Sequence, residues 1–170
     1  MSHRRHWGSG STGATFFEVA IVLTLMGALI VLSILATKRF IQRAKASATA
    51  AQMAFVRNGL LSFAANCEGL PVSAASGGDP GLLYAPNNIP CWSGPYLTRW
   101  PDTTSFGHGS TYRYQGAPGS PAALIAQNLS PSDALALSSE VRRSLGGQVH
   151  LDSTTRLWSV TVAIGDYYRR

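Results

Sequence analysis

A long apolar segment close to the N-terminus is the strongest feature in the hydropathy pattern of this chain. Residues 14–36 contain a single ionisable side chain, the carboxylate of Glu18. A helix of this length rises roughly 34 Å at ~1.5 Å per residue, enough to cross the ~30 Å hydrocarbon core of a bilayer. The pattern therefore predicts a membrane-spanning helix that begins near Ala14.

The helical pattern continues beyond the apolar segment. Residues 37–58 contain no proline or glycine and are rich in alanine and long unbranched side chains, which favour helix. We therefore expect one helix from residue 14 to about residue 65, with an apolar stripe that a C-terminal sheet covers. The stripe has steps of three and four residues and consists of Ile41, Ala44, Ala48, Ala51 and Phe55.

The segment that follows this helix is rich in glycine and proline throughout residues 66–120, which predicts structured loops instead of long regular elements. The only two cysteines, Cys67 and Cys91, bracket its first half. In an exported chain this even count favours a disulfide. A metal site is the alternative, and the lack of a CxxC spacing or a nearby histidine weighs against it.

Three aromatic residues follow Cys91, namely Trp92, Tyr96 and Trp100. They could form an exposed adhesive patch, but aromatic side chains in a small domain more often fill the space between a loop and a helix. We therefore expect them to pack in the core. Gly59, near the end of the long helix, is either a packing contact or a weak point.

The last third of the chain alternates strand-like and helix-like segments. Strands are predicted at residues 110–114, 122–126, 148–152 and 157–164. In the last of these the predicted core face consists of Trp158, Val160, Val162 and Ile164. Together with the long helix, these strands indicate an α+β fold with a small C-terminal antiparallel sheet.

A short helix is predicted between the second and third of these strands. Ser130 has the position of an N-cap, Pro131 that of the first helical residue, and Asp133 lies near the positive end of the helix dipole. Gly146 and Gly147 end the helix.

Composition restricts the class of protein. A chain of 170 residues is one ordinary domain with a small appendage, here the anchor. The formal net charge of +6 is spread along the chain without aromatic residues between the basic ones, so no nucleic-acid partner is predicted. Residues 1–13 are short, basic and rich in Gly and Ser, so the positive-inside rule keeps them cytoplasmic and everything after Ala36 is exported.

Catalytic and metal-binding patterns do not occur in the sequence. There is no Gly-x-Ser-x-Gly, phosphate loop or His-Glu-x-x-His, and no carboxylate pattern links His108 with His150. Asp152 and Asp166 lie near the C-terminus without further acidic ligands, so no calcium site is predicted. His3 and His6, in the N-terminal segment, are assigned no site. We predict no enzyme activity, cofactor or metal.

The carboxylate of Glu18 needs a positively charged partner, because an acidic side chain in an apolar span costs at least ~2.5 kcal/mol. No Lys, Arg or His lies between Glu18 and Lys38. Cleavage between Gly13 and Ala14 would create an α-amine about one turn from Glu18. This stretch resembles the cleavage and methylation site of type IV pilins and of the pseudopilins of type II secretion. The resemblance lies in Gly13, then Ala14, then Thr-Phe-Phe-Glu18-Val and a long apolar run.

The resemblance implies how the chain is processed and assembled. A prepilin peptidase would cut after Gly13, Ala14 would be N-methylated, and Glu18 would pair with the α-amine of Ala14 in the adjacent subunit. Ala14 departs from the family's usual Phe or Met, and Leu35 stands where a proline commonly follows the glycine matched by Gly27. The segment Gly-Pro-Tyr-Leu at residues 94–97 also resembles minor pilins and pseudopilins.

The expected organisation follows from this resemblance. Residues 1–13 are the leader peptide, residues 14–36 the transmembrane and polymerisation half of the helix, and residues 37–170 the periplasmic or extracellular pilin domain. The chain would span the bacterial inner membrane once, with its N-terminus cytoplasmic, before it joins a periplasmic or cell-surface filament. Expected partners are other pilin or pseudopilin subunits, the prepilin peptidase, the inner-membrane assembly platform and membrane lipid.

Other interpretations of the apolar segment stay open. A secretory signal peptide has a shorter apolar region that ends at a small-residue cleavage site. A plain single-pass anchor would have no need of Glu18. The main alternative function is a membrane-anchored periplasmic binding or adhesion module that does not polymerise.

Overall fold

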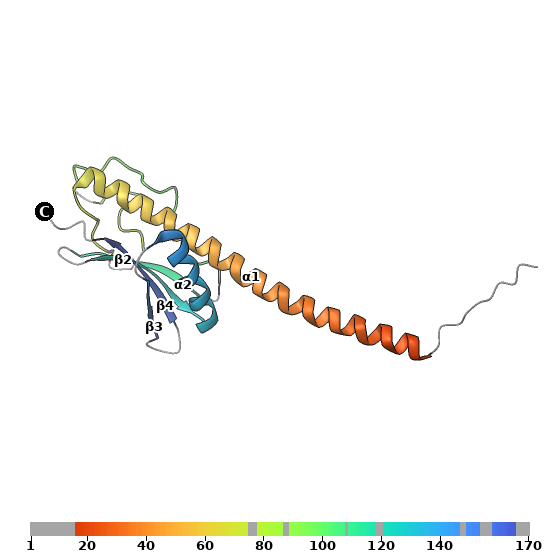
Figure 1. Cartoon of the computed structure of the whole chain (residues 1–170). Coiled ribbons are helices and arrows are strands. Elements are labelled where there is room, and N and C mark those ends of the chain that lie inside the picture. Colours follow the sequence, from red (N-terminus) through yellow and green to blue (C-terminus); the bar gives the residue numbers. More distant parts are fainter. Residues whose placement is uncertain are drawn as a thin grey trace, which may run out of the picture. The chain divides into compact units, whose positions relative to one another are not determined.

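A computed structural model describes residues 16–74, 78–86, 89–107, 109–117, 121–146, 149–153 and 158–165. The elements, in chain order, are α1 (Phe16–Cys67), β1 (Thr111–Gln115), β2 (Ala122–Leu129), α2 (Pro131–Leu145), β3 (Val149–Asp152) and β4 (Trp158–Gly165) (Figure 1). The fold is α+β, with one long N-terminal helix and a small antiparallel sheet, as the sequence predicts.

The chain divides into two compact units, Met1–Arg39 and Phe40–Arg170. The described part of the first unit is the apolar portion of α1. The second unit contains the rest of α1, the loop region, the sheet and α2. After the end of α1, the described positions up to residue 110 contain no helix or strand. They contain one isolated bridge, between Thr103 and Thr111. This agrees with the predicted loop region.

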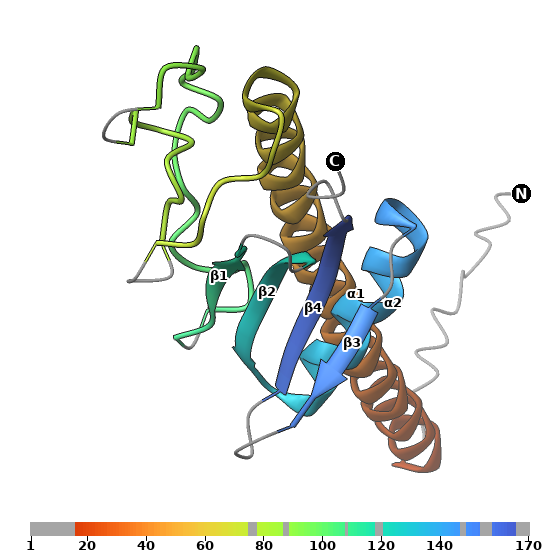
Figure 2. The same ribbon diagram turned by 90° about the vertical axis from the view of Figure 1, so that its left-hand side faces the viewer.

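The sheet has the strand order β1-β2-β4-β3, and every neighbouring pair is antiparallel (Figure 2). The predicted strands are confirmed, although β2 runs on to Leu129 and residues 148 and 157 lie outside the described part of the chain. The predicted core face of β4 is also correct: Val160, Val162 and Ile164 are buried, and Trp158 is half-buried against the core.

The predicted core face of the long helix is wrong. All five residues of the predicted stripe are exposed, among them Ile41 at 48% and Phe55 at 46%. Met53, which is fully buried, lies two positions from Phe55 and therefore about 200° away around the helix. The buried residues of this half of α1 are Ala46, Thr49, Ala50, Met53, Val56, Gly59, Leu60, Phe63 and Ala64.

Two features of the sequence explain this error. Alanine occurs on both sides of the helix, so it does not distinguish them, and Thr49 interrupts the true core stripe with a polar residue. The Thr49 hydroxyl accepts a hydrogen bond from the backbone N–H of Ser105 at 3.2 Å, which satisfies the buried polar group. The larger side chains of Met53, Val56 and Leu60 therefore decide which face the domain covers.

Helix α2 begins and ends as predicted. The Ser130 hydroxyl accepts a hydrogen bond from the backbone N–H of Asp133 at 3.2 Å, and Pro131 occupies the first turn. Gly146 adopts the left-handed conformation that ends the helix, with φ 63°. Leu137 and Val141 are buried, so one face of α2 contributes to the same core as the sheet and α1.

Candidate functional site

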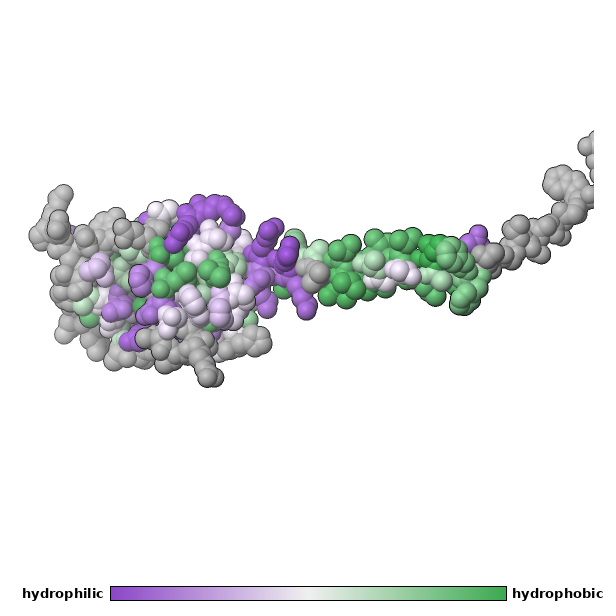
Figure 3. All heavy atoms as spheres, turned by 60° about the horizontal axis from the view of Figure 1, so that its bottom comes forward, coloured by the Kyte–Doolittle hydropathy of each residue, from purple (hydrophilic) through white to green (hydrophobic). Residues whose placement is uncertain are grey.

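The apolar portion of α1 exposes its side chains on all sides. Between Phe16 and Ile34 the exposed large hydrophobic residues are Phe16, Phe17, Val19, Ile21, Val22, Leu23, Leu25, Met26, Leu29, Ile30, Val31, Leu32 and Ile34. Figure 3 shows them as an almost continuous apolar surface. The helix is long and apolar enough to cross a membrane, by length and composition.

The few polar side chains of this segment are satisfied within the helix. The hydroxyls of Thr24, Ser33 and Thr37 each donate a 2.8 Å hydrogen bond to the backbone carbonyl four residues earlier. Because these donors have partners, they add little to the cost of placing the helix in an apolar medium. An added Cβ at Gly27 would meet no atom within 4 Å, so this position leaves room for close approach of another helix.

Glu18 lies in the first turn of α1 and is exposed. At this position its carboxylate is close to the positive end of the helix dipole. Gly13 and Ala14, the predicted cleavage and methylation residues, lie outside the described part of the chain. Cleavage, methylation and the pairing of Glu18 with a neighbouring subunit stay predictions.

The predicted disulfide is confirmed. Cys67, the last residue of α1, is bonded to Cys91, with an S–S distance of 2.05 Å and a Cα–Cα distance of 5.1 Å. The bond ties the loop region to the end of the helix.

The aromatic residues after Cys91 pack as predicted. Trp100 is buried, and the Tyr96 ring makes edge contacts with Phe63 at 5.5 Å and with Trp92 at 5.9 Å between ring centroids. The Trp92 indole N–H donates a 2.9 Å hydrogen bond to the carbonyl of Gly81. These rings therefore connect the loop to α1 and do not form an exposed patch.

The Tyr96 hydroxyl is held by polar neighbours. It accepts hydrogen bonds from the Asn66 side chain at 3.0 Å and from the Ser93 backbone N–H at 3.1 Å. Burial opposes ionisation of this hydroxyl, but the hydrogen bonds from Ser93 and Asn66 together outweigh it and lower the pKa of Tyr96.

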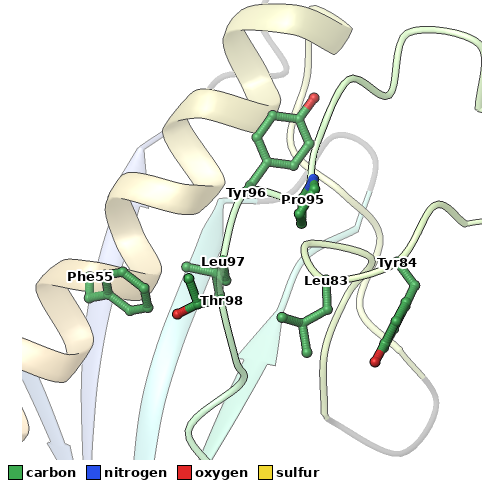
Figure 4. A pocket seen from close by; sticks show the side chains of 7 residues that line it. All are labelled: Phe55, Leu83, Tyr84, Pro95, Tyr96, Leu97 and Thr98. Atoms are coloured by element: carbon green, nitrogen blue, oxygen red, sulfur yellow. The ribbon is translucent and has the colours of Figure 1, made fainter.

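An open groove of about 410 Å³ lies beside these rings, between α1 and two loop segments (Figure 4). Its lining includes Phe55, Tyr84, Pro95 and Thr98. Tyr84 is 79% exposed, and the sequence does not predict this because a single loop tyrosine carries no local signal of exposure. The lining is largely apolar and contains no titratable group other than the two tyrosine hydroxyls, so it suits contact with an apolar or aromatic partner.

Residues examined as metal ligands or catalytic groups are not brought together. His150 and Asp152 are both exposed on β3, and His108 and Asp166 lie outside the described residues. Within the described ranges no three His, Cys, Asp or Glu side chains are grouped closely enough to hold a metal ion.

Comparison with known proteins gives no match to a protein-family model, to a curated protein or to a solved structure.

Proposed function

We propose that this protein is a subunit of a type IV pilus-like or type II secretion filament, similar to a minor pilin or pseudopilin. The observation that carries the proposal is an apolar helical segment whose large side chains between Phe16 and Ile34 are exposed and whose single carboxylate, Glu18, lies in its first turn. Such a surface is stable only in a membrane or against other apolar helices. A filament subunit needs both environments, one before assembly and the other after it.

Assembly in this proposal depends on a charge created by processing. A peptidase removes residues 1–13, and the new α-amine of Ala14 pairs with Glu18 of the adjacent subunit. Leaving either charge unpaired in a dry filament core costs several kcal/mol, so the pair sets the axial register between subunits. The unprocessed chain lacks this amine at Ala14 and does not assemble.

The disulfide supports export of the second unit. Structural disulfides persist in oxidising compartments such as the periplasm and the cell surface. The bond between Cys67 and Cys91 therefore fits a domain that has crossed the inner membrane.

A membrane-anchored binding module is the second candidate. The groove with the exposed Tyr84 ring favours it, because an exposed aromatic ring beside an apolar hollow is a common way to hold a partner. In this case the chain keeps its anchor in the membrane and does not enter a filament.

The test of the proposed function combines processing with assembly. Mass spectrometry of the mature protein should show a start at Ala14, with or without a methyl group. Glu18→Ala should abolish incorporation into sheared filaments while leaving membrane insertion intact. Thr24→Ala, which changes a polar side chain further along the same segment, is the matched control and should assemble normally.

A mature chain that keeps residues 1–13 or that starts after Ala36 would reject the proposed function. Normal incorporation of the Glu18→Ala variant would reject only the ion-pair mechanism of assembly. An unprocessed chain that stays in the membrane and binds a partner through the groove would favour the anchored module.

A further inference from the structure

A dense group of basic residues follows the apolar segment on α1. Lys38, Arg39, Arg43 and Lys45 lie within eight positions of the helix, and we call them the basic collar. The first three are exposed and Lys45 is partly exposed.

The basic collar has no neutralising carboxylates on its own helix. From residue 19 to residue 67 the chain contains no Asp or Glu. The acidic residues of α2 have other partners. The Asp133 carboxylate accepts hydrogen bonds from the Gln42 side-chain amide and from the Ser130 hydroxyl. Glu140 forms a salt bridge with Arg143 at 2.8 Å. No carboxylate in the described part of the chain forms an ion pair with any of the four residues. An ordinary solvated surface mixes both signs of charge, whereas this one does not.

The position of the basic collar matches the thickness of a membrane. Lys38 follows Glu18 by twenty positions, which corresponds to ~30 Å of helix and to the ~30 Å hydrocarbon core of a bilayer. When Lys38 reaches the headgroups on one side, Glu18 therefore lies at the edge of the hydrocarbon on the other side. Long basic side chains at a helix end extend towards the interface in this way.

We propose that the basic collar binds the headgroup phosphates of anionic phospholipids in the leaflet next to the C-terminal end of the apolar segment. This contact sets the depth of α1 in the membrane and keeps Glu18 at the opposite interface. The inference rests on the membrane insertion that the proposed function includes, but not on filament assembly.

Lipid selectivity of the full-length chain tests this proposal. The protein is reconstituted into phosphatidylcholine vesicles, with and without phosphatidylglycerol, and spin-labelled lipids report which headgroup is immobilised at its surface. We expect several-fold enrichment of phosphatidylglycerol, because each basic side chain close to an anionic surface strengthens binding about fivefold. High salt should reduce the enrichment, since it screens charges that lie more than a few ångströms apart.

Two quadruple variants separate the effect of the basic collar on lipid selectivity from the effect of net charge. The variant K38Q/R39Q/R43Q/K45Q should lose the enrichment. The control R99Q/R113Q/R142Q/R143Q removes the same number of charges from exposed positions outside α1 and should keep it. Flotation of every variant with the vesicles checks that the apolar segment still inserts.

Three results would overturn the proposal. One is equal immobilisation of both lipids by the wild-type chain, and another is an equal loss of enrichment in both quadruple variants. A third is binding of a DNA oligonucleotide that depends on the basic collar without any lipid selectivity, which would assign a nucleic acid as the partner. A chain that selects phosphatidylglycerol but never starts at Ala14 would keep this inference and remove the proposed function.

Discussion

The Tyr112 hydroxyl on β1 donates a 2.6 Å hydrogen bond to the side-chain carbonyl of Gln52 on α1, sixty residues earlier in the chain. The same hydroxyl lies 3.4 Å from the backbone carbonyl of Thr49. The sheet is therefore joined to the helix by a buried polar contact as well as by apolar packing, because Tyr112 is 4% exposed.

This contact makes stability depend on pH in the alkaline range. Burial raises the pKa of Tyr112 well above its ordinary value, although the hydrogen bond with Thr49 opposes this effect. Above about pH 10 the unfolded chain releases this proton while the folded chain keeps it, so the free energy of unfolding should fall by about 1.4 kcal/mol per pH unit. Urea unfolding of the wild type and of Tyr112→Phe between neutral and alkaline pH measures the difference. If the free energy of unfolding falls with pH equally in the wild type and in the variant, the raised pKa of Tyr112 is contradicted.

The disulfide should be a large contribution to stability. Cys67 and Cys91 are 24 positions apart, and closing a loop of this size lowers the entropy of the unfolded chain by an amount worth roughly 3.5 kcal/mol. The variant C67S/C91S should lose about this free energy of unfolding, measured by urea titration of the detergent-solubilised chain. Reduction of the wild type should give the same loss, and the variant itself should not respond to reductant. A difference under ~1 kcal/mol would contradict the chain-entropy account.

Gly59 is a packing contact. An added Cβ would lie 2.7 Å from Cδ2 and 3.0 Å from Cγ of Leu97, whose side chain is buried, and 3.3 Å from the carbonyl oxygen of Tyr96. Gly59→Ala should therefore lower the free energy of unfolding by about 1–3 kcal/mol, even though alanine favours a helix over glycine by about 1 kcal/mol. Thermal and urea unfolding measure this loss.

Two further variants test whether the contact with Leu97, and not a general effect on the helix, causes the loss of stability in Gly59→Ala. In a Leu97→Ala background, which removes the two closest atoms and leaves the Tyr96 carbonyl oxygen at 3.3 Å, Gly59→Ala should cost much less than in the wild-type background. Gly27→Ala is the control, because a Cβ there meets no atom within 4 Å, and it should not lower stability. Stabilisation by Gly59→Ala in the wild-type background would contradict the packing role.

The face of α1 that carries the core can be tested with two neighbouring residues. Met53→Ala removes a fully buried side chain and should cost about 2–5 kcal/mol. Phe55→Ala removes a larger side chain that is 46% exposed and should cost under ~1 kcal/mol. Equal losses, or the opposite order, would contradict the observed orientation of the helix. The midpoints of urea unfolding measure these losses, provided that the dependence of the free energy of unfolding on urea concentration is the same in both variants.

Local patterns predicted most of the secondary structure. The cap of α2 needs only Ser130, Pro131 and Gly146, which are close together in the chain, and the alternation in β4 spans a single strand. The disulfide needed only the cysteine count, because two cysteines in one exported chain have one intramolecular pairing.

The features that sequence reasoning missed depend on contacts between distant segments. The exposed stripe with Ile41 and Phe55 resembles a core stripe by spacing alone, and a hydrogen bond from Ser105 makes Thr49 acceptable in the core. Tyr84 is exposed although its loop and Pro95 line one groove together with Phe55 of α1, which is distant in the sequence (Figure 4). No window of adjacent residues contains this information.

The amino-acid sequence by itself determined the length of the apolar segment, the presence of one carboxylate near its start and the concentration of basic residues after it. These are properties of consecutive residues on one helix, so they do not depend on what packs against them. Only the tertiary structure decided which side of the second half of α1 is buried and where the loop aromatics lie. Both depend on side-chain volumes and hydrogen bonds contributed by strands and loops far away in the chain.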